Sequence, residues 1–286
     1  MARSKNTPSF TELTHQVVRE SPEPLPFSEI LQRVHAIAPI TTRNPKGTIR
    51  SAISQSRLIV ATGDGRYGWK PRLITGSVLR LTLSESDLAG RAVEFDDDLR
   101  DALWPSFFAN QKRSDRSPVG VRLPGGGTTQ LPLDFLGIGC WGTTGSPEFW
   151  TWFKTLKTTP GDHLIFRVLD GEARLHSVEF QPRAAREEAA IAERNQAIVQ
   201  AALTFLRSKH NGAVLWDITS HLLATGQYRH PIPPDPISEI WTPEVWMPEM
   251  KDQEPYGKWM LTGGSGPVSS LISRLFERSA QIYDGE

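Results

Sequence analysis

The stretch Asn44-Pro-Lys-Gly-Thr-Ile-Arg-Ser-Ala-Ile-Ser-Gln-Ser56 runs directly into Arg57-Leu-Ile-Val-Ala-Thr-Gly-Asp-Gly-Arg-Tyr-Gly-Trp69. The first half predicts a helix, because Asn44 is a preferred capping residue and Pro45 is tolerated in a first helical turn. Its apolar residues recur at three- and four-residue spacing: Ile49, Ala52 and Ile53. The second half predicts two short strands joined by the glycine-rich turn 63–66. A helix with a small, polar and basic outer face, followed by a basic-tipped hairpin, is therefore expected here.

Two further helices are expected before this stretch. Apolar residues at helical spacing predict one helix that ends before Ser21-Pro-Glu-Pro24 and another that begins at Phe27. These residues are Phe10, Leu13, Val17 and Val18 in the first helix, and Ile30, Leu31 and Val34 in the second. Three helices followed by a hairpin is the element order of a winged helix, which we expect to form a domain over residues 1–75.

The motifs of this region also resemble a known family. They are Phe10-Thr-Glu-Leu13, Pro24-Leu-Pro-Phe-Ser-Glu-Ile30, Lys46-Gly-Thr-Ile-Arg-Ser-Ala-Ile53 and Gly63-Asp-Gly-Arg-Tyr-Gly-Trp69. Together they resemble the winged-helix family called HARE-HTH, a helix-turn-helix type that occurs in restriction enzymes, in a bacterial RNA polymerase subunit and in chromatin proteins. The resemblance implies DNA binding in most settings. Because some winged helices bind only protein, a docking module remains the alternative.

Residues 76–183 predict short strands separated by Gly and Pro. The strand-like runs are 78–83, 119–123, 164–169 and 174–180, and Asp170-Gly171 between the last two is a hairpin signal. Such a pattern favours a small β-barrel or sandwich. The order Leu103-Trp-Pro-Ser-Phe-Phe108, Trp150-Thr-Trp-Phe153, Pro160-Gly-Asp162 and Leu164-Ile-Phe-Arg-Val168 is similar to the pseudobarrel of plant B3 DNA-binding domains. That resemblance implies a second module that reads DNA, although a modified base or a protein remains an alternative ligand.

The C-terminal part is expected to be mostly helical. Residues 184–194 are rich in strong helix formers and predict a connecting helix. Residues 195–286 repeat the N-terminal layout: Lys46-Gly-Thr-Ile-Arg-Ser-Ala-Ile-Ser-Gln55 is echoed by Ser265-Gly-Pro-Val-Ser-Ser-Leu-Ile-Ser-Arg274. We therefore expect a second, degenerate winged helix, interrupted by an acidic Pro- and Trp-rich insertion at 230–262. This C-terminal domain is expected to contact a protein partner or to form a homodimer. The alternative is an unrelated helical cap. The chain as a whole is predicted to be an α+β multidomain protein.

Composition narrows the classes of function. The 286 residues carry 32 Lys and Arg against 32 Asp and Glu, so no overall field attracts an anionic partner. The balance is local, because residues 1–75 hold eleven basic and five acidic residues, a net charge of +6. The single cysteine, Cys140, excludes an internal disulfide and fits a reducing compartment. Without an apolar run of membrane-spanning length or an apolar signal core, we expect no membrane association and a cytoplasmic location, at the nucleoid if the chain binds DNA.

Candidate DNA contacts gather on the predicted third helix and hairpin, with a basic loop in the middle region. They are Arg43, Lys46, Thr48, Arg50, Ser51, Ser54, Gln55, Arg57, Arg66, Lys70, Lys112, Arg113 and Arg116. Basic and small polar side chains supply phosphate and base contacts when a helix enters the major groove. For any single residue the alternative is an ordinary solvated surface. Their joint placement on one helix and one hairpin is what favours the interface.

No enzyme motif accompanies these residues. Phosphate-loop, zinc-protease and nucleophile-elbow patterns are missing, and the histidines lie without partners at ligand spacing. The acidic run Asp96–Asp98 precedes a predicted helix, where acids favour the positive end, so we expect no metal site, catalytic residue or cofactor. The sequence thus predicts a non-enzymatic reader of double-stranded DNA, either a transcription regulator or a restriction- or defence-associated protein. An interaction adaptor that docks proteins is the alternative, followed by an enzyme whose site carries no known motif.

Overall fold

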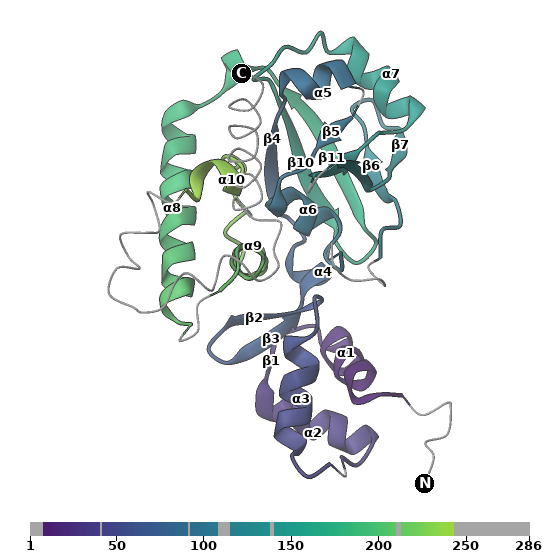
Figure 1. Cartoon of the computed structure of the whole chain (residues 1–286), viewed down its shortest axis with the longest axis vertical. Helices are drawn as coiled ribbons and strands as arrows, with labels where there is room; N and C mark the ends of the chain where they lie inside the picture. The colour runs from purple at the N-terminus through teal and green to yellow at the C-terminus, as the bar shows by residue number, and fades with distance from the viewer. Residues whose placement is uncertain are drawn as a thin grey trace, which may run out of the picture.

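The computed structural model describes residues 8–40, 42–90, 92–107, 115–137, 140–209 and 213–242. Within these residues the chain forms ten α-helices and three β-sheets, so the expected mixture of helices and sheets is confirmed. In Figure 1 the N-terminal helices and their small sheet lie at the bottom of the molecule. The larger sheet lies above them, and the long helix of residues 188–207 stands beside it.

The N-terminal unit contains three helices and a three-stranded sheet with the strand order β1-β3-β2. Its elements are α1 (Phe10–Glu20), β1 (Leu25–Pro26), α2 (Phe27–Ile37), α3 (Pro45–Ser54), β2 (Ile59–Gly63) and β3 (Arg66–Trp69). A capping box begins α1, in which Ser9 and Glu12 each accept the backbone N–H of the other. The apolar faces of the helices meet the hairpin in one core, which includes Leu13, Ile30 and Ile49. The three predicted helices and the hairpin are confirmed as elements.

The middle of the chain forms two open sheets, and neither closes into the expected barrel in the part of the chain that the structure describes. The strands are β4 (Val78–Thr82), β5 (Val93–Glu94), β6 (Val119–Arg122), β7 (Thr128–Leu131), β8 (Asp134–Gly137), β9 (Cys140–Thr143), β10 (His163–Asp170) and β11 (Leu175–Gln181). The larger sheet has the order β4-β10-β11-β6-β7, and the smaller one has the order β5-β9-β8. The larger sheet is open because β4 and β7 lie at its opposite edges and do not pair with each other, and within it β6 joins β11 in parallel. The predicted hairpin at Asp170-Gly171 is confirmed by the antiparallel pairing of β10 with β11.

Helices cover these sheets and share their core. They are α4 (Lys70–Leu73), α5 (Glu85–Gly90), α6 (Asp97–Leu103), α7 (Pro147–Thr155), α8 (Glu188–Arg207), α9 (Leu215–Ala224) and α10 (Ile237–Ile240), with a 3₁₀ turn at Arg183–Ala185. One continuous apolar core runs from Ile74 to Trp241 and contains residues of both sheets, α6, α8, α9 and α10. It therefore crosses the domain boundary that the sequence suggests near residue 184.

Of the second winged helix that the sequence predicts, two helices lie among the described residues. The connecting helix expected at 184–194 begins at Glu188 and continues to the end of α8 without a break. α8 and α9 pack against each other, as the first two helices of a second winged helix would. The expected third helix and most of the insertion at 230–262 lie outside the described residues. Trp241, within the predicted insertion, is only 6% exposed and belongs to the core.

Candidate nucleic-acid interface

The start of α3 is shaped by its own sequence. The Asn44 side-chain oxygen accepts the backbone N–H of Gly47 at 2.9 Å, and Pro45 occupies the first turn. A Cβ atom on Gly47 would lie only 2.6 Å from Asn44 Nδ2, so glycine makes room for this cap. Ile49 and Ile53 face the core, as the spacing predicted. The helix is therefore fixed on its inner side and presents the opposite face to solvent.

That outer face carries most of the predicted DNA contacts. The exposed members are Lys46, Arg50, Ser51, Ser54 and Gln55, with Arg43 exposed just before the helix and Thr48 half-buried. Neighbouring side chains hold part of this face in place: Gln55 Nε2 donates to Ser51 Oγ at 3.1 Å, and the Arg50 guanidinium lies 5.2 Å from the Phe27 ring centroid. The structure thus brings these seven predicted residues together on one surface.

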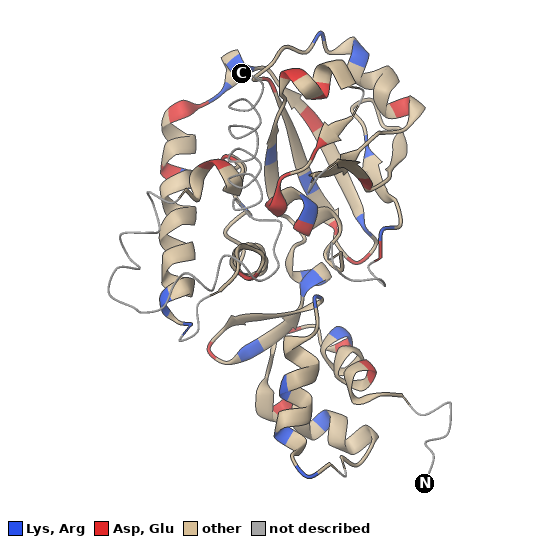
Figure 2. Ribbon diagram, viewed as in Figure 1, with Lys and Arg blue, Asp and Glu red and all other residues tan. Residues whose placement is uncertain are grey.

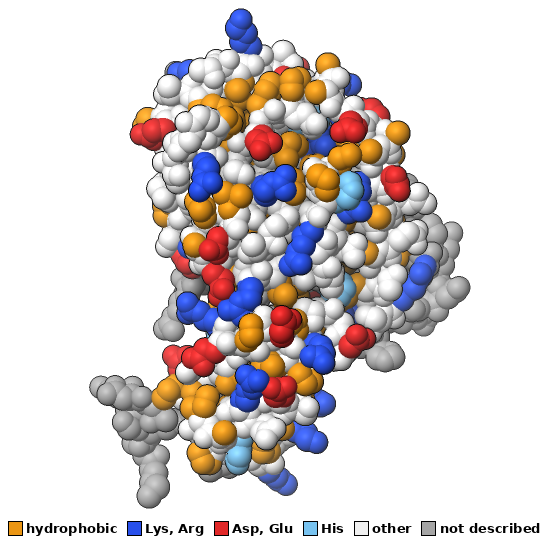
Figure 3. Space-filling view, turned by 180° about the vertical axis from the view of Figure 1, so that it is seen from behind, with side chains coloured by type: hydrophobic (Ala, Val, Ile, Leu, Met, Phe, Trp, Pro, Cys, Tyr) orange, Lys and Arg blue, Asp and Glu red, His pale blue; other side chains and the backbone are white. Residues whose placement is uncertain are grey.

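The charge of this surface has one sign. Residues 42–63 contain four basic residues, Arg43, Lys46, Arg50 and Arg57, and no Asp or Glu. The ribbon of α3 in Figure 2 accordingly carries blue bands. Helices normally favour acids in the first turn, so a lysine there does not serve the stability of the helix itself. Seen from behind, in contrast, acidic and basic side chains are interspersed over the molecule (Figure 3).

The β2–β3 hairpin places one cation beside α3. Its turn requires positive φ angles at Gly63 (106°), Asp64 (48°) and Gly65 (69°), which explains the glycines of the sequence. Arg66 is exposed, and its guanidinium donates to the Pro24 carbonyl at 3.0 Å. This hydrogen bond ties the base of the hairpin to the segment before β1, while Arg66 stays exposed.

Lys70, predicted as a contact beside the hairpin, is not part of this surface. Its side chain is fully buried, forms an ion pair with Asp101 of α6, and donates to Ser220 Oγ of α9 at 3.0 Å. Its ammonium also lies 4.5 Å from the Trp216 ring centroid. Burial lowers the Lys70 pKa, whereas the neighbouring Asp101 carboxylate raises it. Lys70 therefore joins the N-terminal unit to the helices above it and cannot reach DNA.

Arg57 is also turned away from the α3 face. Its guanidinium lies 3.9 Å from the Trp216 ring centroid, and the residue is half-buried. The sequence could not signal this, because Trp216 lies 159 positions further along the chain. Arg57 and Lys70 thus stack on the same indole and anchor α9 against the hairpin.

The basic loop of the middle region is only partly described. Lys112 and Arg113 lie outside the described residues. Arg116 is exposed, and its guanidinium lies 5.7 Å from the ring of Trp141 on β9. Arg116 belongs to the sheet region and is not among the residues that line α3, so a contribution from this loop remains a prediction.

Other side chains that could take part in catalysis or bind a metal are engaged in structural contacts. In the described residues no cluster of three or more His, Cys, Asp and Glu side chains is arranged to hold a metal ion. Burial and the neighbouring Glu94 raise the pKa of the Cys140 thiol to about 11, so it stays protonated at neutral pH. Burial together with Asp96 raises the pKa of Asp98 to about 8, and its carboxyl accepts a hydrogen bond from Tyr228 at 3.2 Å. These groups stabilise α6 and its surroundings.

Neither a membrane-spanning helix nor a similar known protein adds information about the site. No helix among the described residues combines the length and apolar character needed to cross a bilayer. No protein-family model, curated protein sequence or solved structure matches this chain. Among the described residues, the arrangement of side chains that points most directly to a function is the polar and basic face of α3, which carries no acid.

Proposed function

We propose that the N-terminal unit is a winged helix that binds double-stranded DNA, with α3 in the major groove. The observation that carries the proposal is the outer face of α3, where exposed basic and amide side chains gather without any acid between residues 42 and 63. The order of three helices and a hairpin, with β1 completing the small sheet, also supports it. The biological setting is that of a transcription regulator or a restriction- or defence-associated DNA reader.

The residues divide into two roles. Arg50 and Gln55 lie on the exposed face of α3, where an Arg side chain can pair with guanine and a Gln side chain with adenine. Arg43 and Lys46 are exposed and precede or begin the helix. In the proposed complex they contact phosphates, which position the protein without reading sequence. Arg66 supplies a further phosphate contact from the hairpin.

The α3 surface is tested by the double variant Arg50→Ala with Gln55→Ala. Both side chains are exposed, so we expect unchanged thermal stability and a loss of about 1–3 kcal/mol of DNA-binding free energy for each base contact removed. Binding is measured by mobility shift on random duplex pools, with and without a divalent metal, so that cleavage is detected in the same experiment.

The matched control is Gln32→Ala with Arg33→Ala, which removes the same residue types from exposed positions of α2. If both double variants bind as well as the parent protein, α3 does not read DNA. Binding of the parent that falls steeply with salt marks phosphate contacts. No binding even at low salt favours the adaptor.

The adaptor function retains one specific observation in its favour. Phe135 on β8 is 59% exposed, and its ring lies 5.1 Å from that of Trp141. Large exposed aromatic side chains are enriched where proteins dock. A Phe135→Ser variant that loses a partner without any change in DNA binding would identify such a surface.

A further inference from the structure

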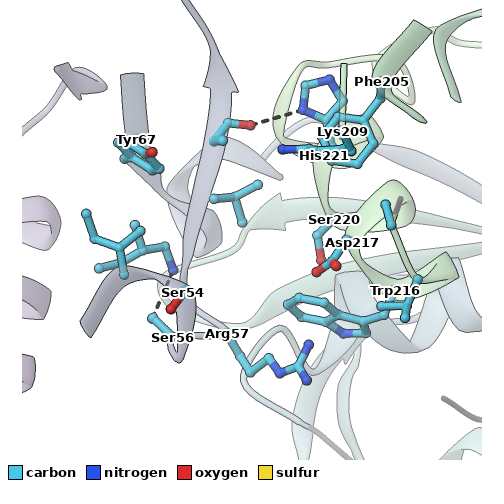
Figure 4. A pocket seen from close by; sticks show the side chains of 16 residues that line it. Ser54, Ser56, Arg57, Tyr67, Phe205, Lys209, Trp216, Asp217, Ser220 and His221 are labelled. Atoms are coloured by element: carbon cyan, nitrogen blue, oxygen red, sulfur yellow. Dashed lines mark hydrogen bonds between the residues drawn. The ribbon is translucent and has the colours of Figure 1, made fainter. Parts of the chain in front are cut away.

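An open cleft of about 400 Å³ separates the N-terminal unit from α8 and α9. Ser54, Ser56 and Tyr67 line it from the α3 and hairpin side, as Figure 4 shows. Lys209, Trp216 and Asp217 line it from the opposite side. His221 Nδ1 and the Ala61 carbonyl oxygen of β2 lie 3.0 Å apart and bridge the walls, as does the contact of Arg57 with Trp216. Pockets of this volume accommodate small ligands.

The cleft offers a cation for an anionic group. Lys209 follows the end of α8, and its ammonium lies 4.4 Å from the Phe205 ring centroid. Within the described residues it forms neither a hydrogen bond nor an ion pair with a side chain. Figure 4 shows it at one end of the cleft and Arg57 at the other. A phosphate is the anion that a single flexible lysine commonly binds.

The cleft also offers an acceptor for N–H donors. The Asp217 carboxylate lies between these two cations and beside Ser220 in Figure 4. Burial raises the pKa of Asp217, whereas Arg57 and Lys209 act in the opposite direction. A ligand that brought only negative charge would face repulsion here. A ligand with paired N–H donors would instead satisfy both carboxylate oxygens.

Aromatic side chains complete the set of contacts. Tyr67, Phe205 and Trp216 line the cleft together with the imidazole of His221, which stacks on Phe205 at a centroid distance of 4.2 Å. A neutral sugar would leave Lys209 without an anion, and an aromatic carboxylate would leave Asp217 without a donor. A planar base that carries N–H donors and a phosphate matches all three features.

We propose that this cleft binds a guanine nucleotide, with its phosphate on Lys209, its N1–H and N2–H groups on Asp217, and its base against the aromatic wall. The source is either a free nucleotide or an unpaired guanosine of a bound DNA. The inference does not depend on DNA binding by α3, since neither Lys209 nor Asp217 belongs to that surface.

Titration calorimetry with GMP tests the free-nucleotide source. Lys209→Ala is expected to weaken GMP binding at least tenfold, whereas Lys154→Ala, at an exposed lysine of α7, leaves it unchanged. IMP, which lacks the N2 amino group, should bind more weakly than GMP, and Asp217→Asn should remove that preference. Unchanged GMP binding in both cleft variants, or equal binding of GMP and IMP by the parent protein, overturns the assignment to this cleft.

A second titration distinguishes the source of the guanine. A duplex with one bulged guanine is compared with its fully paired counterpart. If GMP does not bind but the bulged duplex binds more tightly, and only when Lys209 and Asp217 are intact, the source is DNA. If neither GMP nor the bulge shows this dependence, the proposal is wrong. The variant Arg50→Ala with Gln55→Ala should retain GMP binding, so failure of the α3 proposal is recognised separately.

Discussion

Single residues show where burial and partners override local sequence. His176 on β11 is fully buried, faces the core beside Val121 and Val168, and neither ring nitrogen has a hydrogen-bond partner. Burial lowers the pKa of His176 to about 3, because the charged imidazolium would be unsolvated. The unfolded chain titrates near the usual pKa of about 6.5. Between these values the unfolded state binds a proton that the folded state does not.

Acid should therefore destabilise the protein through His176. Its contribution is fully present above pH 6.5 and is lost as the pH falls toward the folded-state pKa of about 3. In the variant His176→Leu the free energy of unfolding should fall less steeply as the pH is lowered. Near pH 3 the variant should retain on the order of 4 kcal/mol that the parent protein loses. Urea unfolding between pH 3 and 7 measures the difference.

The matched control is His35→Leu, which removes a histidine from an exposed position of α2. The raised pKa of Asp98 acts in the opposite direction, because stability from its protonated form falls as the pH rises from about 4 to about 8. That contribution is common to all three proteins and cancels in the comparison. Parallel curves for His176→Leu and the parent would show that the unpaired imidazole carries no such cost.

The wrong prediction for Lys70, as a DNA contact beside the hairpin, shows what a sequence leaves undetermined for single residues. Trp69-Lys70-Pro71 reads as a cation next to a hairpin, and nothing local indicates burial. Its partner Asp101 lies 31 residues later on α6, and Ser220 lies 150 residues away. A buried lysine requires such partners, and only the tertiary fold brings them together.

At the scale of elements, local signals predict local structure well. The cap at Asn44, the apolar spacing of α3 and the glycines of the hairpin each act over a few residues, and all three features are present as expected. Strand pairing is different, because alternating apolar and polar residues predict a strand but do not determine which other strand it pairs with. β6 pairs in parallel with β11, more than fifty positions away, and no local signal in either segment indicates this pairing.

The hairpin gives a prediction at the same scale. Arg66 is the exposed cation at its turn, and its contact with DNA is expected to be with phosphate. Arg66→Glu should weaken binding to all duplex sequences alike and lower the slope of log affinity against log salt by about 1. Mobility shifts over a salt series measure this slope. Lys154→Glu reverses charge on α7 and should leave the slope unaltered; an unchanged slope for Arg66→Glu removes the hairpin from the interface.

At the scale of the whole molecule, two apolar cores are joined through polar contacts around α4. The Arg72 guanidinium donates to Glu172, in the turn between β10 and β11, at 3.1 Å, and to the Arg19 carbonyl of α1 at 2.8 Å. A Cβ atom on Gly171 would collide with the Pro71 carbonyl oxygen, so the β10–β11 turn lies directly against α4. With Lys70 bound to α6 and α9, these contacts fix the orientation of α3 relative to the sheets.

The Lys70–Asp101 pair should therefore control the cooperativity of unfolding. Lys70→Met leaves the Asp101 carboxylate buried without its cation, which costs about 3–5 kcal/mol. We expect one calorimetric transition for the parent protein, and a lower midpoint with a separate transition of the N-terminal unit for Lys70→Met. The double variant Lys70→Met with Asp101→Leu removes both charges and should recover much of the midpoint, because replacing a whole buried pair is far less costly than removing one partner. Lys154→Met is the matched surface control. If Lys70→Met and Lys154→Met unfold alike in a single transition, the junction does not couple the two cores, and the orientation of α3 must depend on other contacts.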